Sequence, residues 1–404
     1  MENDQFNNNQ NYEGGNDYEY DSDQGSDEQQ VIPPEDIKPL RIGITHGDVN
    51  SISYEVILKS LQDDRVFEYF TPVLYGSSKV ASYHRKALNM NEIAFHVIRN
   101  ADQAEDKKLN LVNVITQEVK VDLGQSTDVA GKAAYLALEA ATLDLAQGRI
   151  DALVTGPINK QNIQSKDFNF PGHTEYLAGK FQSRDYLMLM VSQSMRIGVI
   201  TGHVPLRDVP SLISEELLLQ KIRIMNNTLV RDFGIRKPRI AVLGLNPHAG
   251  DKGVLGVEEE TTIIPAIQKA CEQGMLAFGP YPADGFFGSS TFSSFDGILA
   301  MYHDQGLIPF KSMAFQAGVN FTAGLPIVRT SPAHGTAYEL AGKNHASPES
   351  FREAIYLAMD VVRNRRLFDE INQNPLKISA LEEDTDKDKD ELKSLEDDSD
   401  QIIL

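Results

Sequence analysis

The sequence predicts an α/β fold with a largely parallel sheet, on the basis of three observations. Short apolar runs alternate along the chain with segments of helical spacing, which is the order of a strand–helix–strand fold. The runs are apolar on both faces, as in strands that helices cover on each side. With 404 residues, 41% of them hydrophobic, the chain is long enough for one large or two ordinary domains.

The individual elements follow from the local pattern. The segments that indicate strands are 41–45, 71–76, 109–115, 151–157, 186–192, 196–201, 239–245 and 297–303. Helical spacing marks 55–63, 79–89 and 131–148, and Gly148 is placed to end the last of these. Because 186–192 and 196–201 follow each other so closely, we expect them to form an antiparallel element or to mark a second subdomain.

Most of the net charge of −20 lies in two terminal segments. Residues 1–38 carry a net charge of −10 and residues 375–404 a net charge of −7, which leaves −3 for residues 39–374. Neither terminal segment has the apolar content that would offset its ordering entropy, so we expect both to be disordered acidic tails. For residues 390–404 a short helix formed on a partner stays an alternative to a solvated tail.

Composition excludes several classes of protein. There is no run of 18 apolar residues, so no membrane span is expected, and the N-terminus lacks the pattern of a signal peptide. The single cysteine, Cys271, excludes a disulfide framework and a thiolate metal cluster. The nearly neutral body gives no electrostatic reason to expect nucleic acid as a partner. We therefore expect a cytoplasmic protein with neither nucleic acid nor membrane as a partner.

Three histidines occupy equivalent positions in this pattern. His203, His248 and His303 each follow a separate apolar strand segment. In a parallel sheet the carboxyl ends of the strands meet at one edge, where ligands bind. Taken singly, each histidine is more typical of a hydrogen-bonded loop residue than of a ligand. Together they predict a divalent-metal site with positions left for substrate or water.

Further polar residues suggest an anion site. His173 and Thr174 follow a Pro-Gly turn, although the glycine spacing there does not fit a phosphate-binding P-loop. No G-x-G-x-x-G follows any strand segment, so a standard Rossmann dinucleotide site is not expected. Lys311 and Arg329 could hold a phosphate or carboxylate, and ordinary surface ion pairs are the alternative for them. The polar residues of the same later region also include Asn320 and His334.

At these residues the sequence resembles the 4-hydroxythreonine-4-phosphate dehydrogenase family of vitamin B6 biosynthesis. The segments that carry the resemblance are RIGITHGD (41–48), ALVTGPINK (152–160), FPGHTEYLA (170–178), TGHVPLRDVP (201–210), LGLNPHAG (243–250), AMYHDQGLIPFK (300–311), GVNFTAGLPIVRTSPAHGTA (318–337) and ELAGK (339–343). They run in order from about residue 41 to about residue 360, which is essentially the whole body. Neither acidic tail belongs to the family pattern.

The resemblance implies a fold like that of isocitrate and isopropylmalate dehydrogenases, with two α/β domains around a cleft. The first domain is expected at 39–165 plus 312–374, on the nucleotide side. The second is expected at 166–311, on the side of the metal and of dimerisation. The resemblance also implies a homodimer whose metal site lies at the interface, with one histidine donated by the partner subunit.

The resemblance further assigns roles to individual residues. The metal ligands are expected at His203, His248 and His303. The contacts to the phosphorylated substrate are expected at His173, Thr174, Lys311, Asn320 and Arg329. The stretch from His334 to Lys343 looks like a nucleotide-binding loop, which assigns His334 to the cofactor, NAD.

The reaction that the resemblance implies is the oxidation of 4-phosphooxy-L-threonine by NAD. The product, 2-amino-3-oxo-4-phosphooxybutanoate, then loses CO2 to give 3-amino-2-oxopropyl phosphate. The donor set is suited to Zn²⁺ or Co²⁺, and Mg²⁺ stays open. The acceptor of the hydroxyl proton is also open among Lys311, Asp304 and a water on the metal.

The first loop departs from the family pattern. In THGDVNSISYE (45–55), Ser51 and Ser53 stand where glycines are usual, and Tyr54 replaces a proline. Glycine permits a close backbone approach that serine resists, so the loop is expected to run differently or to change the affinity for the cofactor. His46 adds an imidazole here, which we expect to be a cleft residue rather than a fourth metal ligand. Gly202 stands where the family commonly has threonine.

Three other functions compete with this interpretation. The nearest is a dehydrogenase for another phosphorylated four-carbon acid, such as a phosphothreonate or phosphoerythronate. A phosphate acyltransferase of related fold would need neither the metal histidines nor NAD. A non-catalytic protein that recruits partners through its tails is the third.

Overall fold

The computed structural model of the chain describes residues 39–314 and 317–374. These described residues belong to one compact unit. Both predicted acidic tails, and with them the helix considered for 390–404, lie outside the described residues. No described helix combines the length and the apolar character that crossing a membrane requires.

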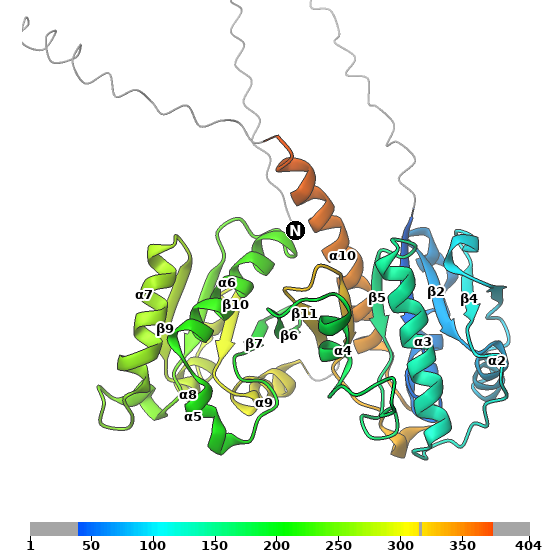
Figure 1. The fold of residues 1–404 in the computed structure, drawn as a ribbon, viewed down its shortest axis with the longest axis horizontal. Coiled ribbons are helices and arrows are strands. Elements are labelled where there is room, and N and C mark those ends of the chain that lie inside the picture. Colours follow the sequence, from blue (N-terminus) through cyan, green and yellow to red (C-terminus); the bar gives the residue numbers. More distant parts are fainter. Residues whose placement is uncertain (1–38, 315–316, 375–404) are drawn as a thin grey trace, which may run out of the picture. The chain divides into compact units, whose positions relative to one another are not determined.

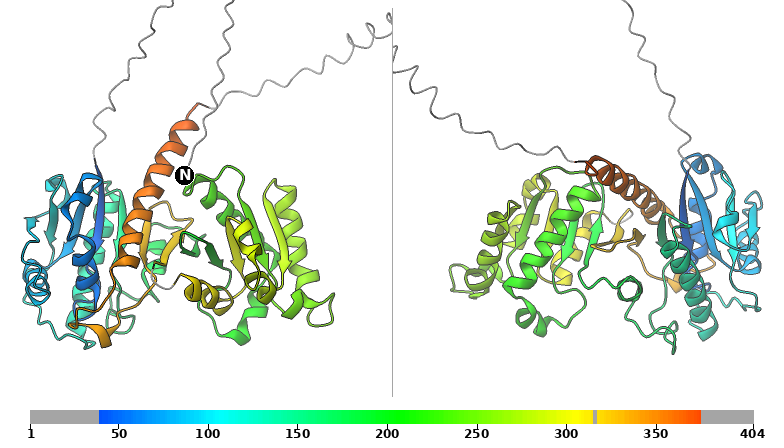
Figure 2. Two further views of the ribbon diagram at one scale, coloured as in Figure 1. Left: turned by 180° about the vertical axis from the view of Figure 1, so that it is seen from behind. Right: turned by 45° about the horizontal axis from the view of Figure 1, so that its top comes forward.

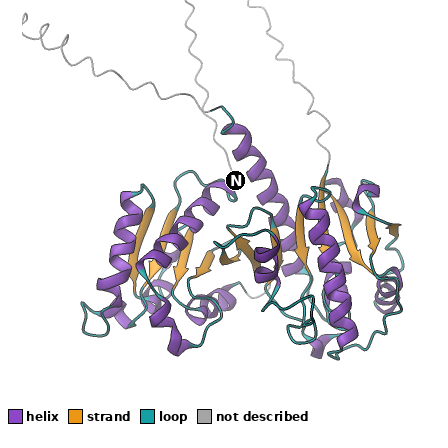
Figure 3. Cartoon of the chain, in the orientation of Figure 1, coloured by secondary structure: helices purple, strands orange, loops and turns teal. Residues whose placement is uncertain are grey.

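The described residues form a mixed α/β fold around one large sheet (Figures 1 and 3). The strands are β1 (Leu40–Thr45), β2 (Phe70–Gly76), β3 (Phe95–Ile98), β4 (Leu109–Asn113), β5 (Ala152–Thr155), β6 (Leu187–Val191), β7 (Arg196–Val199), β8 (Arg239–Leu243), β9 (Leu276–Tyr281), β10 (Gly297–Ala300), β11 (Val319–Ala323) and β12 (Arg329–Pro332). The helices are α1 (Ser53–Ser60), α2 (Ser78–Ala87), α3 (Asp128–Ala146), α4 (His173–Lys180), α5 (Val209–Leu212), α6 (Glu215–Arg231), α7 (Ile264–Glu272), α8 (Ala283–Phe287), α9 (His303–Met313) and α10 (Glu349–Ile371).

The strand order is β3-β4-β2-β1-β5-β12-β11-β6-β7-β10-β8-β9. The strands from β3 to β12 run parallel to one another, and so do β7, β10, β8 and β9. Between these two sets, β11 pairs antiparallel with β12 and β6, and β6 pairs antiparallel with β7. The expected α/β class and the expected antiparallel element at 186–201 are therefore confirmed.

Helices cover the two faces of the sheet because alternate side chains of each strand point to opposite faces. On one face, alanines and leucines of α3 pack with Val73, Tyr75 and Leu153. On the other, α10 packs with Ile42 and Ile44. Figures 1 and 2 show α3 and α10 on opposite sides of the same strands. The division into domains at 39–165 plus 312–374 and 166–311 is not decided by this sheet, and it stays a prediction.

Two predicted boundaries differ from the structure for local reasons. The strand expected at 297–303 ends at Ala300, since His303 is the first residue of α9. The helix expected at 131–148 begins earlier, because the Thr127 hydroxyl accepts from the backbone N–H of Ala130 and caps α3. That helix stops before Gly148, which has a φ of +69° as predicted for a C-terminal glycine.

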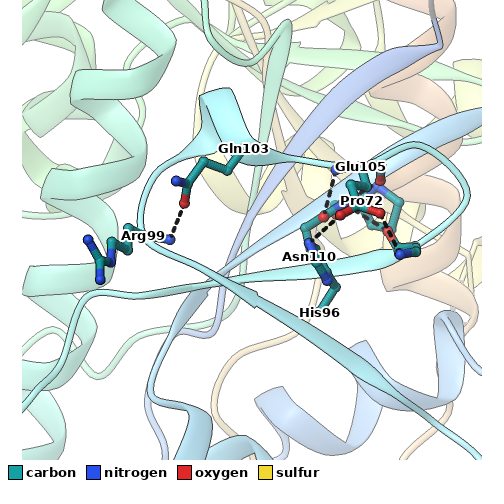
Figure 4. A network of polar contacts seen from close by, with 7 residues as sticks. Pro72, His96, Arg99, Gln103, Glu105 and Asn110 are labelled. Atoms are coloured by element: carbon teal, nitrogen blue, oxygen red, sulfur yellow. Dashed lines mark hydrogen bonds and ion pairs between the residues drawn. The ribbon is translucent and has the colours of Figure 1, made fainter.

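At the edge strand β3, His96 belongs to a separate polar network (Figure 4). Its Nε2 lies 3.1 Å from Oε1 of Glu105. The side-chain amide of Asn110 donates to the backbone carbonyls of Glu105 and Pro72. Several strands separate β3 from the three histidine-bearing strands, so His96 is a remote imidazole against which the candidate site can be compared.

Candidate active site

The three strands that precede the candidate metal histidines are neighbours in the sheet. β10 lies between β7 and β8 and is parallel to both, so their carboxyl ends meet at one edge. The rings of His203 and His303 lie side by side there, with their centroids 5.2 Å apart. The prediction that strand ends bring imidazoles together is thus confirmed for this pair.

His303 has a carboxylate behind it. Its Nδ1 lies 2.7 Å from Oδ1 of Asp304. An ionised carboxylate can only accept, so Nδ1 donates to Asp304 and Nε2 is the ring nitrogen left for a ligand. A carboxylate that orients a histidine in this way is typical of metal ligands. Asp304, one of the candidate proton acceptors, is engaged in this bond.

His203 is held neutral by its surroundings. Burial lowers its pKa, and the positive charge of Lys160 and the neighbouring His303 lower it further, while Glu175 opposes them. A neutral imidazole has a lone pair for a cation. The donor chemistry of His203 and His303 therefore fits a divalent transition metal.

His248 is presented differently. It lies in a short turn, Pro247–Gly250, that follows β8, and it is exposed to solvent. Across residues 39–314 and 317–374, no three His, Cys, Asp or Glu side chains of a single chain are grouped closely enough to hold a metal ion. The assignment of all three histidines to one metal stays a prediction.

A cavity of about 670 Å³ extends from His203 to the other polar residues singled out from the sequence. Its lining includes His173, Thr174, Asn320, Arg329 and His334. The C-terminal ends of β5, β7 and β12 and the first turn of α4 form part of the cavity wall. Lys311 does not line this cavity: it is exposed on α9, and its role in substrate binding stays a prediction.

Arg329 is a buried cation on the cavity wall. Its guanidinium donates to Oγ1 of Thr155 from Nη2 (2.7 Å) and Nε (3.1 Å), and to Oγ1 of Thr322 from Nη1 (3.4 Å). Within the described residues its hydrogen bonds go only to neutral groups. Burial lowers the pKa of Arg329 to about 10, with Glu175 opposing the shift. A buried cation without a carboxylate against it is the electrostatic signature of a site for an anion.

His173 adds a neutral donor to this site. Nη2 of Arg329 lies 3.2 Å from its Nδ1. Since a guanidinium can only donate, Nδ1 accepts and the ring proton lies on Nε2. Burial, then the charges of Arg329 and Lys160, hold the pKa of His173 well below its usual range. Nε2 is buried and has no partner among the described residues, so its N–H is available to an anion.

Sequence reasoning missed Lys160 and Glu175. Both residues line the cavity. Both also lie close to Gly172, which precedes α4: a Cβ added to Gly172 would be within 4 Å of Oε2 of Glu175 and of Cε of Lys160. Lys160 lies in the quoted segment ALVTGPINK, in the loop that follows β5. That position at a strand exit was the available signal for it.

The prediction that His46 lies in the cleft is wrong. His46 is fully buried, is not part of the cavity lining, and stacks on Tyr54, which in turn stacks on His84 (centroids 5.4 Å and 4.7 Å). Ser51 fits the loop by donating from its hydroxyl to the Asp48 carbonyl oxygen (2.6 Å). The loop therefore uses hydroxyl bonds and ring stacking where glycines were expected.

The predicted nucleotide loop is tied to this first loop. The hydroxyl of Tyr338 donates to Oδ2 of Asp48 (2.7 Å), and the backbone N–H of Ile52 donates to the carbonyl of Thr336 (3.2 Å). His334 lines the cavity, and burial lowers its pKa. Its assignment to the cofactor stays a prediction.

Comparison with known proteins gives consistent results. Residues 68–358 match the family model described as pyridoxal phosphate biosynthetic protein PdxA. A 4-hydroxythreonine-4-phosphate dehydrogenase from Bacteroides thetaiotaomicron is 50% identical over 360 residues, which cover 89% of this chain and 99% of that protein. A putative D-threonate 4-phosphate dehydrogenase from Oceanobacillus iheyensis is 36% identical and covers 80% and 98%. The crystal structure of 4-hydroxythreonine-4-phosphate dehydrogenase from Klebsiella pneumoniae superposes with a TM-score of 0.70 at 32% identity, over 80% and 99% of the two chains.

Proposed function

Because the chain belongs to the pyridoxal phosphate biosynthetic protein PdxA family, we propose that it oxidises 4-phosphooxy-L-threonine with NAD in a reaction that needs a divalent metal. The product is 2-amino-3-oxo-4-phosphooxybutanoate, which loses CO2 to give 3-amino-2-oxopropyl phosphate. The step serves the formation of pyridoxal 5′-phosphate. A relative with half of its residues identical over nearly its whole length supports this substrate.

The single observation that carries the proposal is the buried Arg329 with His173 beside it. The guanidinium has no carboxylate partner in the described part of the chain, and Nε2 of His173 has a free N–H. A phosphate bound here accepts from both groups and neutralises the cation. Thr174 lies at the start of α4, where helix N–H groups also favour an anion. The substrate is thereby anchored by its phosphate, with its hydroxyl-bearing carbon toward His203.

The residues proposed to hold the metal are His203, His303 and His248. A bound Zn²⁺, Co²⁺ or Mg²⁺ would polarise the oxygen on the reacting carbon, and bound NAD would accept the hydride. This chain's own contribution is to present imidazole nitrogens to the metal: burial favours the neutral ring of His203, and the hydrogen bond to Asp304 orients the ring of His303. The group that takes the hydroxyl proton stays open among Lys311, Asp304 and a water on the metal; of these, Asp304 already accepts one hydrogen bond from His303 through Oδ1.

A homodimer would bring the third imidazole into the site. Large apolar side chains are exposed on the segments that follow each candidate ligand. They are Leu206 and Leu212 after His203, Val254, Leu255 and Val257 after His248, and Ile308 and Met313 after His303. Apolar side chains gathered beside polar groups are typical of a protein–protein contact. We therefore propose that His248 acts together with the other two histidines across a dimer interface.

The test is a steady-state assay with 4-phosphooxy-L-threonine, NAD and a series of divalent metals, followed by NADH absorbance. We expect turnover that a chelator abolishes and that His248→Ala reduces at least about 100-fold. His96→Ala, which removes an imidazole from the remote β3 network, should leave turnover unchanged. Metal-independent turnover, or equal activity of the two variants, would contradict the proposal.

A second candidate substrate is a phosphorylated hydroxy acid without the amino group. The similarity to the putative D-threonate 4-phosphate dehydrogenase favours it, at 36% identity against 50% for the amino-acid enzyme. Turnover of D-threonate 4-phosphate and of 4-phosphooxy-L-threonine under the same conditions separates the two. We expect the higher kcat/KM for the amino acid.

A further inference from the structure

The turn that presents His248 has an unusual backbone. Residues 248–253 all have positive φ: His248 (53°), Ala249 (50°), Gly250 (80°), Asp251 (43°), Lys252 (55°) and Gly253 (86°). Four of these six residues are not glycine. For such residues the left-handed conformation brings Cβ too close to the backbone, and it is normally seen one residue at a time. The run therefore persists only because its surroundings hold it.

Hydrogen bonds inside the turn do not anchor it to the rest of the fold. The backbone N–H groups of Asp251 and Gly253 donate to the carbonyls of His248 and Gly250 (3.3 and 3.0 Å). The side chains of Asp251 and Lys252 are exposed, and so is that of His248. These bonds keep the turn coiled, but its direction must be set elsewhere.

Glu259 supplies that anchor. It is a buried carboxylate, only 1% exposed, in the π-helical turn Glu259–Ile263. Its Oε1 accepts from the backbone N–H groups of Leu245 and Asn246, both at 2.8 Å. Its Oε2 accepts from the side-chain amide of Asn246 at 3.0 Å. Both oxygens are thus engaged by the two residues just before the turn that begins at Pro247.

The glycines around Glu259 show how closely the turn is built on it. A Cβ added to Gly250 would lie 2.6 Å from Oε2 of Glu259, and one added to Gly244 would lie 3.2 Å from Oε1. Gly250 belongs to the left-handed run itself, so the run passes directly over the carboxylate. A shift of the carboxylate would therefore move the backbone on both sides of His248.

We propose that Glu259 is a positioning residue for the metal, holding the left-handed turn so that His248 is presented at the edge where His203 and His303 meet. It is not a ligand itself, because its oxygens are occupied by N–H donors. This inference rests on the proposed function, since it takes His248 as a metal ligand. What it adds is the group that keeps the turn in its strained form.

The test measures metal binding rather than turnover. Co²⁺ is titrated into the full chain against a competing chelator, and its visible absorption reports the ligand set. We expect Glu259→Gln to weaken Co²⁺ binding about 10- to 100-fold, as loss of a group that orients a ligand does. Glu260→Gln is the matched control: the neighbouring side chain is exposed, loses the same charge, and should change the affinity less than twofold.

A second substitution separates positioning from charge. Ala249→Gly relieves the left-handed strain, because glycine adopts positive φ without a steric cost. In the Glu259→Gln background it should restore a large part of the Co²⁺ affinity. An electrostatic effect of Glu259 on the metal would not be restored in this way. Unchanged affinity in Glu259→Gln, or a loss that Ala249→Gly does not reduce, overturns the inference.

Two further measurements guard against misinterpretation. If Glu259→Gln does not fold, Asn246→Ala removes one of the donors to Glu259, and its smaller loss of Co²⁺ affinity should likewise be reduced by Ala249→Gly. His248→Ala is titrated in parallel. If it weakens Co²⁺ binding and Glu259→Gln does not, the inference fails and the proposed function stands. If His248→Ala binds Co²⁺ like the wild type, His248 is no ligand and both are overturned.

Discussion

Two buried arginines differ in a way that predicts opposite effects of the same substitution. Arg329 hydrogen-bonds only to neutral groups within the described residues, whereas Arg365 donates to both carboxylate oxygens of Asp232 (2.7 and 3.1 Å). Both arginines are less than a tenth exposed. We expect Arg329→Met to stabilise the ligand-free protein and Arg365→Met to destabilise it.

The magnitude for Arg329 follows from its pKa. Burial lowers that pKa from the ordinary value of an arginine to about 10, and at about 1.4 kcal/mol per pKa unit the charged form costs about 3 kcal/mol. The cost is fully present at any pH below about 10, and it disappears only as the pH rises from there toward the ordinary pKa of an arginine. The bonds to Thr155 and Thr322 offset about 1 kcal/mol of it. The substitution should therefore raise the free energy of unfolding by about 1–2 kcal/mol at neutral pH.

The same substitution should remove the anion site. Loss of a charge-assisted contact to phosphate costs about 2–3 kcal/mol, so binding of inorganic phosphate should weaken roughly 30- to 150-fold. Arg365→Met should leave phosphate binding unchanged but lower the free energy of unfolding by about 3–5 kcal/mol, because the carboxylate of Asp232 stays buried without its partner. Urea unfolding and isothermal titration with phosphate measure the two effects. The reasoning is refuted if Arg329→Met is clearly less stable than the wild type, or if it binds phosphate equally well.

Three further predictions concern the buried histidines His46 and His84, the cavity residue His173, and Gly131 of α3. His46 and His84 both have a pKa lowered to about 4, mainly by burial. Their contribution to the free energy of unfolding should therefore be fully present above about pH 6.5 and be lost as the pH falls toward 4. His84→Phe should reduce by about one the number of protons taken up on urea unfolding near pH 5. His173→Gln keeps an N–H near the place of Nε2, so it should bind inorganic phosphate more tightly than His173→Ala in the same titration, and equal affinities would contradict the assigned tautomer. Gly131→Ala should lower the free energy of unfolding by about 1–3 kcal/mol, since its Cβ would lie 1.9 Å from the carbonyl oxygen of Asn162; an unchanged urea midpoint would show that this loop yields freely.

The strands and helices that local patterns predicted occur in the structure, because each depends on a short stretch of chain. The strands β3, β9, β11 and β12 and the helices α6, α7 and α10 were not predicted. The strands at 41–45 and 71–76 and the helix ending before Gly148 occur where apolar spacing and a terminal glycine indicate them. The close succession of 186–192 and 196–201 correctly indicated an antiparallel pair. Which strands become neighbours is a different matter, because pairings between distant segments leave no local pattern. The insertion of β11 between β12 and β6 is one such pairing.

The residues of the candidate site were likewise predictable from the sequence only in part. Positions after strands identified His203 and His303, because the sheet itself brings such positions to one edge. The burial of His46 was not predictable in this way, since it depends on Tyr54 and His84 stacking beneath the loop. Lys160 was missed because a lysine after a strand is ordinary until the fold brings it close to His173.

In a single ligand-free chain, several groups of the candidate site lack an interaction partner or have a strained backbone. Arg329 lacks an anion, Nε2 of His173 and Oδ1 of Asn320 lack partners in the described part of the chain, and the turn at His248 is held against its own preference. Such missing partners and strain lower the free energy of unfolding, and proteins retain them where the binding of a ligand offsets the loss. It follows that ligands should stabilise the protein separately at the two ends of the site: phosphate through Arg329, and Co²⁺ through the histidines. Because no residue proposed as a ligand belongs to both ends, the two increments in the free energy of unfolding should add. A metal that strengthened phosphate binding many-fold would instead show that the two ends are coupled through Lys160, whose charge acts on both His173 and His203.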